Sequence, residues 1–215
     1  MINSAAEPMA VIETRLAHQV HRAATTLLAE AALRPSAPLD TLAQLRDFLV
    51  VNLRHHHETE DEELWPQIVA TAPAAAEGLK GLSEEHERLE DDLDRLAAVA
   101  LTEDHAGAGA RAELHEAAVA VRDTVHSHLD HEEPILFPAL RAHVTPEYWA
   151  ELSQRVIATA PPVAAHLMFG FIDEVGAPGE VEAMMAVLPE PLRPLVPAMR
   201  RQADADLASL RGSAA

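Results

Sequence analysis

Apolar residues recur every three or four positions along four long segments in the first two-thirds of the chain. This spacing places them on one face of an α-helix, so it predicts four amphipathic helices. The predicted helices run from about Met9 to Leu33, from Ser36 to about Ala70, from about Ala74 to Leu101, and from about Ala110 to Arg141. Short breaks between long helices imply antiparallel neighbours. We therefore expect an all-α, up-down-up-down four-helix bundle over residues 1–142.

The remainder, residues 143–215, is more often interrupted. It opens with Thr145-Pro146-Glu147, a typical helix start, and breaks at Pro161-Pro162, at residues 176–179 and at four later prolines. We expect one helix that breaks near Pro161, then short helices, and a last amphipathic helix to about Leu210. This helical extension either packs on the bundle or mediates association, for example into a homodimer.

Histidine and glutamate occupy the apolar stripe of the predicted helices at matching places. The stripe positions concerned are His21 in the first helix, His56 and Glu60 in the second, His86 in the third, and His128 and Glu132 in the fourth. All four helices thus direct such groups into one interior. A buried carboxylate without a partner is costly, so these groups need a shared partner. A pair of metal cations would supply one, because neutral imidazole and carboxylate both bind iron or zinc.

The second and fourth segments also resemble each other. His56, Glu60 and Leu64-Trp65-Pro66 match a second set position for position, namely His128, Glu132 and Leu136-Phe137-Pro138. A His and a Glu four residues apart lie one turn apart on the same face, so each pair can bind metal from one helix. One copy of Leu-aromatic-Pro would simply mark a helix end. Two copies, each following a core-facing His, indicate an internal repeat and a pseudo-symmetric two-metal site.

Composition narrows the function further. The formal net charge is −19, which disfavours nucleic acid as a partner because phosphate binding depends on a surplus of Lys and Arg. There is no cysteine, which excludes disulfides and thiolate ligands. We find no apolar run of about eighteen residues, as a membrane span requires, and no secretory signal. A cytoplasmic location is therefore the default expectation.

With these residues in view, the chain resembles the hemerythrin-like, His-His-Glu (HHE) cation-binding proteins of bacteria over about residues 11–141. The matching motifs are HRA at 21–23, HHHETEDEELWP at 55–66, EHERL at 85–89 and HLDHEEPILFP at 128–138. The resemblance implies two non-haem Fe ions joined by an oxo or hydroxo bridge, with zinc or manganese as substitutes that suit the same donors. It implies Glu60 and Glu132 as bridging carboxylates, and as terminal ligands His21, His56, His86 and His128.

The same resemblance implies a protein that binds or reacts with dioxygen, peroxide or nitric oxide. If it is an enzyme, it would be a peroxidase- or catalase-like, or nitric-oxide-reactive, oxidoreductase. The ligand set does not decide between binding and turnover. A ferritin-like oxidase or oxygenase is an alternative, although such sites use Glu-x-x-His pairs whereas this chain has His before Glu. A helical interaction module without metal is a third reading.

The chain departs from hemerythrin proper in two places. The third helix carries Glu90 where a second His is expected, and the fourth helix places its carboxylate four residues after the His rather than five. Both changes bring it nearer to the bacterial branch, in which the residue after the second-helix His also binds metal. That residue is His57, the expected fifth His. Pro134 removes a backbone hydrogen bond, so we expect a kink there and leave the choice between Glu132 and Glu133 open.

Several other polar residues have alternative readings. His18 lies one turn before His21 and competes with it as first-helix ligand, and we prefer His21. Glu90 is either an extra ligand or, as we prefer, the acceptor that fixes the tautomer of a ligand His. The remaining candidates are expected to be solvated or to support the ligands (His55, His126, His131), or to form an exposed acidic face (Asp61, Glu62, Glu63).

Overall fold

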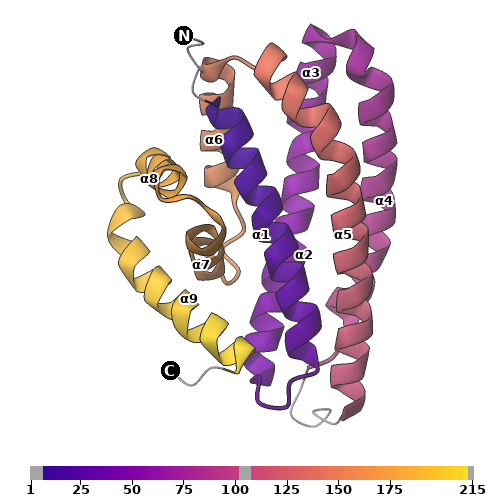
Figure 1. Ribbon diagram of the computed structural model, residues 1–215, viewed down its shortest axis with the longest axis vertical. Helices are drawn as coiled ribbons and strands as arrows, with labels where there is room; N and C mark the ends of the chain where they lie inside the picture. Colours follow the sequence, from indigo (N-terminus) through magenta and orange to yellow (C-terminus); the bar gives the residue numbers. More distant parts are fainter. Residues whose placement is uncertain (1–6, 102–107, 213–215) are drawn as a thin grey trace, which may run out of the picture.

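The computed structural model describes residues 7–101 and 108–212, and in these ranges the chain is all-helical, as predicted (Figure 1). An antiparallel four-helix bundle is formed by four long helices, namely α1 (Met9–Ala32), α2 (Leu39–Thr59), α4 (Ala76–Ala98) and α5 (Ala108–His143). The predicted apolar stripes are buried, and examples from three of these helices are Leu49, Leu93 and Val121.

The second predicted helix is one continuous rod with an irregular middle. α2 passes into a π-helical turn, η1 (Glu60–Leu64), and then into α3 (Trp65–Thr71). The Trp65 N–H donates to the Glu60 carbonyl, five residues back. Pro66 explains this turn, because its ring would clash with the carbonyl four residues earlier in a regular α-helix and it has no N–H to donate. Such single π turns are frequent at functional sites.

The third and fourth predicted helices differ from expectation in detail. A short 3₁₀ turn, η2 (Pro73–Ala75), precedes α4, and α4 ends at Ala98 rather than Leu101. α5 contains both Pro134 and Pro138 and still continues to His143, so the prolines do not break it. Figure 1 shows α5 curving in its upper part.

The apolar core divides into two clusters along the bundle axis. One cluster contains Leu64, Ile68 and Leu136, whereas the other contains Leu53, Leu89 and Val125. Along α2–η1, α4 and α5 the candidate ligand residues occur near the boundary between these two clusters. We call this level of the bundle the polar layer. The polar layer is therefore enclosed by apolar side chains above and below.

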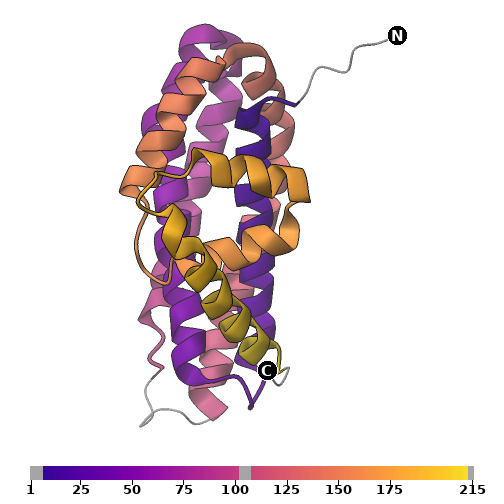
Figure 2. The ribbon, with the colours of Figure 1, turned by 90° about the vertical axis from the view of Figure 1, so that its left-hand side faces the viewer.

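The C-terminal extension packs on α1 and α2. It contains α6 (Pro146–Thr159), α7 (His166–Val175), α8 (Pro178–Val187), η4 (Arg193–Leu195) and α9 (Val196–Arg211), which cover one side of the bundle in Figure 2. The Phe171 ring stacks on that of Phe48 with the centroids 6.2 Å apart. A Cβ atom at Gly170 would lie 2.7 Å from that of Ala203, so the close crossing of α7 and α9 requires glycine here.

Two predictions about this region have different outcomes. The helix start is confirmed, because Thr145 caps α6 by accepting a bond from the Tyr148 N–H at 3.2 Å. Association into a homodimer, and the division into 1–142 and 143–215, stay predictions.

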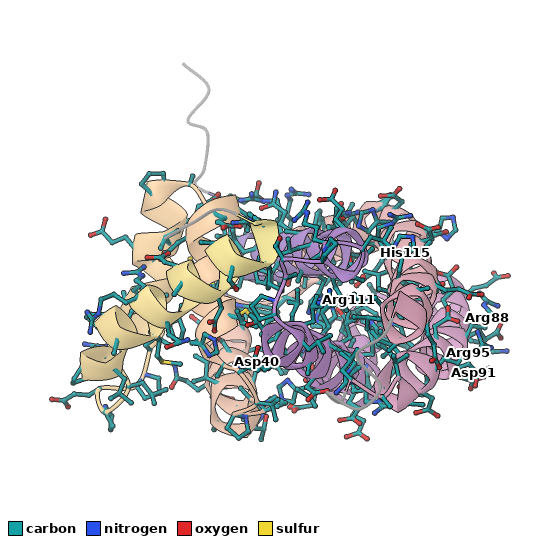
Figure 3. All side chains as sticks on the ribbon, turned by 90° about the horizontal axis from the view of Figure 1, so that it is seen from below. Asp40, Arg88, Asp91, Arg95, Arg111 and His115 are labelled. Carbon is teal, nitrogen blue, oxygen red and sulfur yellow. The ribbon has the colours of Figure 1, made fainter. Side chains whose placement is uncertain are left out.

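Near the start of α5, Arg111 binds the segment that connects α1 to α2 (Figure 3). Its guanidinium donates to the carbonyls of Arg34 at 3.0 Å and of Ala37 at 2.6 Å. No helix in the described residues is long and apolar enough to cross a membrane.

Candidate metal centre

Seven side chains from four helical segments meet in the polar layer as two clusters. We call the first the triple-His cluster (His57, His86, His128) and the second the His/Glu cluster (His18, His56, Glu60, Glu132). Within each cluster, one ligand-type atom from every residue lies within 4.8 Å of the others. Each cluster therefore presents enough donors, close enough together, to hold one metal ion.

The two glutamates face both clusters. The Oε1 atom of Glu60 is 3.3 Å from Nε2 of His56, and its Oε2 atom is 3.7 Å from Nε2 of His86. The Oε2 atom of Glu132 is 3.5 Å from Nε2 of His18 and also 3.5 Å from Nε2 of His128. Each carboxylate thus lies between an imidazole of one cluster and an imidazole of the other. This is the placement that a bridging carboxylate needs.

The carboxylates are deeply buried and lack hydrogen bonds. Glu60 is 2% exposed and Glu132 is fully buried, and none of their four oxygens has a hydrogen-bond partner among the described residues. The same holds for Nε2 of His18 and of His56 and for Nδ1 of His21. Leaving one such group unsatisfied costs on the order of 1–3 kcal/mol, and more if it is charged. Cations bound between these atoms would satisfy them together, so the residues fit a metal centre.

Burial also changes the protonation of these groups. It lowers the pKa of His56 and of His57 well below the usual range, and neighbouring imidazoles add to the effect. For His21, burial followed by the nearby His18 lowers the pKa to about 3. These rings are therefore neutral at pH 7, which is the form that binds metal.

The two carboxylates are affected in opposite directions. Burial raises the pKa of Glu60 well above its usual value, and the neighbouring Glu132 adds to this shift. Burial opposes ionisation of Glu132 as well, but His18 and His128 outweigh it and lower the pKa of Glu132 to about 2. Two adjacent carboxylates in an apolar interior cannot both ionise cheaply without a cation between them.

Three of the imidazoles are oriented by carboxylates outside the two clusters. The Nδ1 atom of His86 lies 2.8 Å from Asp61, that of His128 lies 3.0 Å from Glu85, and that of His18 lies 3.2 Å from Glu133. A carboxylate at Nδ1 holds the proton there and leaves Nε2 as the metal donor. In all three rings, Nε2 is the atom that faces the cluster carboxylates.

Two predictions about the supporting residues are wrong. Glu90 does not accept from a ligand His, because it points outward, 48% exposed, and pairs with Arg54 at 2.5 Å. Asp61 is not simply part of an exposed face, because it is the acceptor for His86. The internal repeat contains the signal that would have identified it. Asp61 follows Glu60 as Glu133 follows Glu132, and each second acid accepts from a His on another helix.

The first-helix donor is where geometry and prediction diverge most. The His/Glu cluster contains His18, whereas the sequence pattern and the resemblance favour His21. His21 is nevertheless buried in the same layer, with its ring centroid 4.8 Å from that of His56. Two residues three positions apart share one helix face, so the sequence pattern alone cannot separate them.

The structure also separates Glu132 from Glu133 and shows what the histidines off the apolar stripe contact. Glu132 faces the centre, whereas Glu133 turns toward Arg22, with which it forms an ion pair. The histidines off the stripe have partners outside the two clusters, and these are Thr159 for His55, the Arg22 carbonyl for His126 and Glu85 for His131.

Comparison with known proteins gives the family. Residues 13–140 match the profile described as hemerythrin HHE cation binding domain, and this range contains all residues of both clusters. No curated protein and no solved structure matched the chain. The matched range covers more than half of the sequence and agrees with the resemblance inferred from the four motifs. The chain therefore belongs to the hemerythrin HHE cation-binding domain family.

Proposed function

We propose that this cation-binding protein is a non-haem di-iron protein in which the two clusters form one dinuclear site. The observation that carries the proposal is the position of Glu60 and Glu132. Their four oxygens are buried without hydrogen bonds, between imidazoles of the two clusters. One metal in either cluster alone would leave the side of each carboxylate that faces the other cluster unsatisfied. Two metals account for both sides.

In this proposal Glu60 and Glu132 would be shared by the two ions, and the surrounding imidazoles would each hold one of them. His57, His86 and His128 would hold one ion. His56 would hold the other together with a first-helix His, for which the geometry favours His18 over His21. Asp61, Glu85 and Glu133 keep the ring nitrogens of three ligands in the metal-binding tautomer.

When bound, two irons would supply reversible electron transfer to or from dioxygen, peroxide or nitric oxide. The protein contributes an interior that is largely shielded from water, because apolar clusters lie on both sides of the polar layer. On this proposal the partners are small molecules rather than nucleic acid, and the location is cytoplasmic.

Two observations disfavour the alternatives. A ferritin-like oxidase would need a carboxylate-rich donor set, whereas five of the seven cluster residues are histidines. A helical module without metal would have to bury two unpartnered carboxylates, at a cost that an apolar pair in the same positions would avoid. A dinuclear centre in this layer would suit the His-rich donor set and would give both carboxylates a partner.

The test is iron content and spectrum on protein made in iron-replete cells. About two irons per chain, matching the two clusters, with near-ultraviolet bands that change on addition of peroxide or nitric oxide, would support the proposal. Folded protein that holds no iron, and takes up none when Fe²⁺ is added without oxygen, would refute it. Stoichiometric zinc without iron would retain the metal site and remove the redox function.

A further inference from the structure

A polar hollow of about 480 Å³ opens between the α2–η1 segment and α4. Its inner wall includes the rings of His57 and His86, which are only 7% and 6% exposed. The other lining side chains are Arg54, Glu58, Asp61, Glu62, Ser83, Glu87 and Glu90. The hollow therefore connects solvent with two of the three donors of the triple-His cluster, whereas no residue of the His/Glu cluster lines it.

The hollow is strongly acidic. Five carboxylates line it, against a single guanidinium, that of Arg54. The positive charge of Arg54 is already neutralised, because its guanidinium pairs with Glu90 and with Asp94, each at 2.5 Å. Glu58, Glu62 and Glu87 are exposed and form no ion pair with any described residue. A recess lined by one sign of charge, with low-dielectric walls, raises the local concentration of the opposite ion.

A second observation shows what the hollow leads to. His57 is more than nine-tenths buried, yet its ring has no hydrogen-bond partner in the described part of the chain. It stacks on His86, with the ring centroids 4.2 Å apart. Asp61 lies beside them and accepts from Nδ1 of His86. The innermost groups of the hollow are thus an uncommitted metal donor, a second imidazole donor and a carboxylate.

The geometry points to this hollow as the path by which divalent transition-metal cations reach the buried centre. The inference rests on the proposed function, since it assumes that the triple-His cluster binds metal. The carboxylates Glu58, Glu62 and Glu87 attract the hydrated ion at the mouth. Asp61 lies between that mouth and the rings of His57 and His86, where the ion exchanges water for imidazole. α4 presents Arg88 and Arg95 elsewhere on its surface (Figure 3), so these cations do not line the hollow.

The path is tested by the rate at which metal-free protein takes up Co²⁺, followed by stopped-flow absorbance at low ionic strength. The hollow variant is Glu58→Gln/Glu62→Gln/Glu87→Gln, and its matched control is Glu113→Gln/Glu116→Gln/Glu182→Gln. Both change the net charge equally, and the control glutamates are exposed and lie outside the hollow. We expect the hollow variant to load roughly tenfold more slowly, with a weaker salt dependence, whereas the control loads like the wild type.

The final amount of bound Co²⁺ separates the two proposals. We expect it to be the same in wild type, hollow variant and control, because none of the substituted residues belongs to a cluster. If the wild type binds no Co²⁺, the proposed function fails, and the path fails with it. If all three proteins bind equally and load at equal rates, the proposed function stands and the path is refuted.

The absence of cysteine allows a sharper version of the same test. A single Glu87→Cys substitution gives a unique thiol at the mouth, and Glu113→Cys gives the same thiol outside the hollow. Each thiol is modified with a small cationic or a small anionic methanethiosulfonate reagent. We expect the cationic adduct at position 87 to slow Co²⁺ uptake and the anionic adduct to restore it, with neither effect at position 113. Equal rates for the two adducts at position 87 would overturn the inference.

Discussion

Replacing Glu60 by methionine should change stability in opposite directions with and without metal. Glu60 is 2% exposed, and both of its oxygens lack hydrogen-bond partners in the described residues. Without metal the carboxyl group therefore lowers the free energy of unfolding. With metal it is, in our account, a donor to both ions. Glu60→Met keeps the length of the side chain and replaces its carboxyl group with an apolar thioether.

The size of each effect follows from the burial and from the metal linkage. Removing an unsatisfied buried polar group should stabilise the metal-free protein by about 1–3 kcal/mol, or a rise of roughly 2–12 °C in Tm for a chain of this size. Free metal at about 100 times Kd should stabilise the wild type by about 2.7 kcal/mol per site. The variant should lose most of this gain at both sites, because the carboxylate faces both clusters.

Thermal or urea unfolding, once in chelator and once with excess metal, measures the effect of the substitution on stability without and with metal. We expect the variant to be more stable than wild type in chelator and less stable in metal. The exposed control Glu113→Met should stay within about 0.5 kcal/mol of wild type in both conditions. If Glu60→Met destabilises the metal-free protein as much as the metal-loaded protein, Glu60 is an ordinary structural residue and the reasoning is wrong.

Three further predictions follow from the geometry of the layer. His18→Ala should weaken metal binding in a competition titration by at least about tenfold more than His21→Ala, and an equal or reversed order would return the first-helix ligand to His21. Asp61→Ala should weaken binding by about 10–100-fold, because it frees a ligand ring to rotate, whereas Glu62→Ala should have little effect. The metal-free protein should lose stability from about pH 7 to pH 5, because the unfolded chain binds protons that buried rings such as His21, with a pKa of about 3, exclude. The raised pKa values of Glu60 and His128 oppose this trend, but the buried imidazoles whose pKa is lowered outnumber them (His21, His56, His57 and His86). A flat urea-unfolding profile would contradict the prediction.

Much of the bundle could be predicted because its signals are local and periodic. A stripe such as Leu45, Leu49 and Leu53 has one physical reading, an amphipathic helix with one buried face. His128 and Glu132 continue such a stripe, and an apolar face that suddenly carries ligand groups indicates a polar centre. The internal repeat predicts the two carboxylates, and the structure places each of them between an imidazole of one cluster and an imidazole of the other.

What the sequence could not supply depends on contacts between helices. Asp61 and Glu90 are both acidic residues near a predicted ligand in the sequence. Which of them contacts His86 depends on the π turn at η1 and on how α2 approaches α4, and in the structure it is Asp61. His18 and His21 share one face, so their separation depends on the rotation of α1 about its axis. Where the extension packs was equally open, because its contact with Phe48 involves residues more than a hundred positions apart.

Anomalous scattering at the iron edge, from crystals of protein loaded with Fe²⁺, tests the central claim most directly. Our account predicts two peaks in the polar layer. One should lie among His57, His86 and His128 and the other beside His56, with Glu60 and Glu132 between them. A single peak, or iron bound only to carboxylates at the surface, would contradict the dinuclear centre.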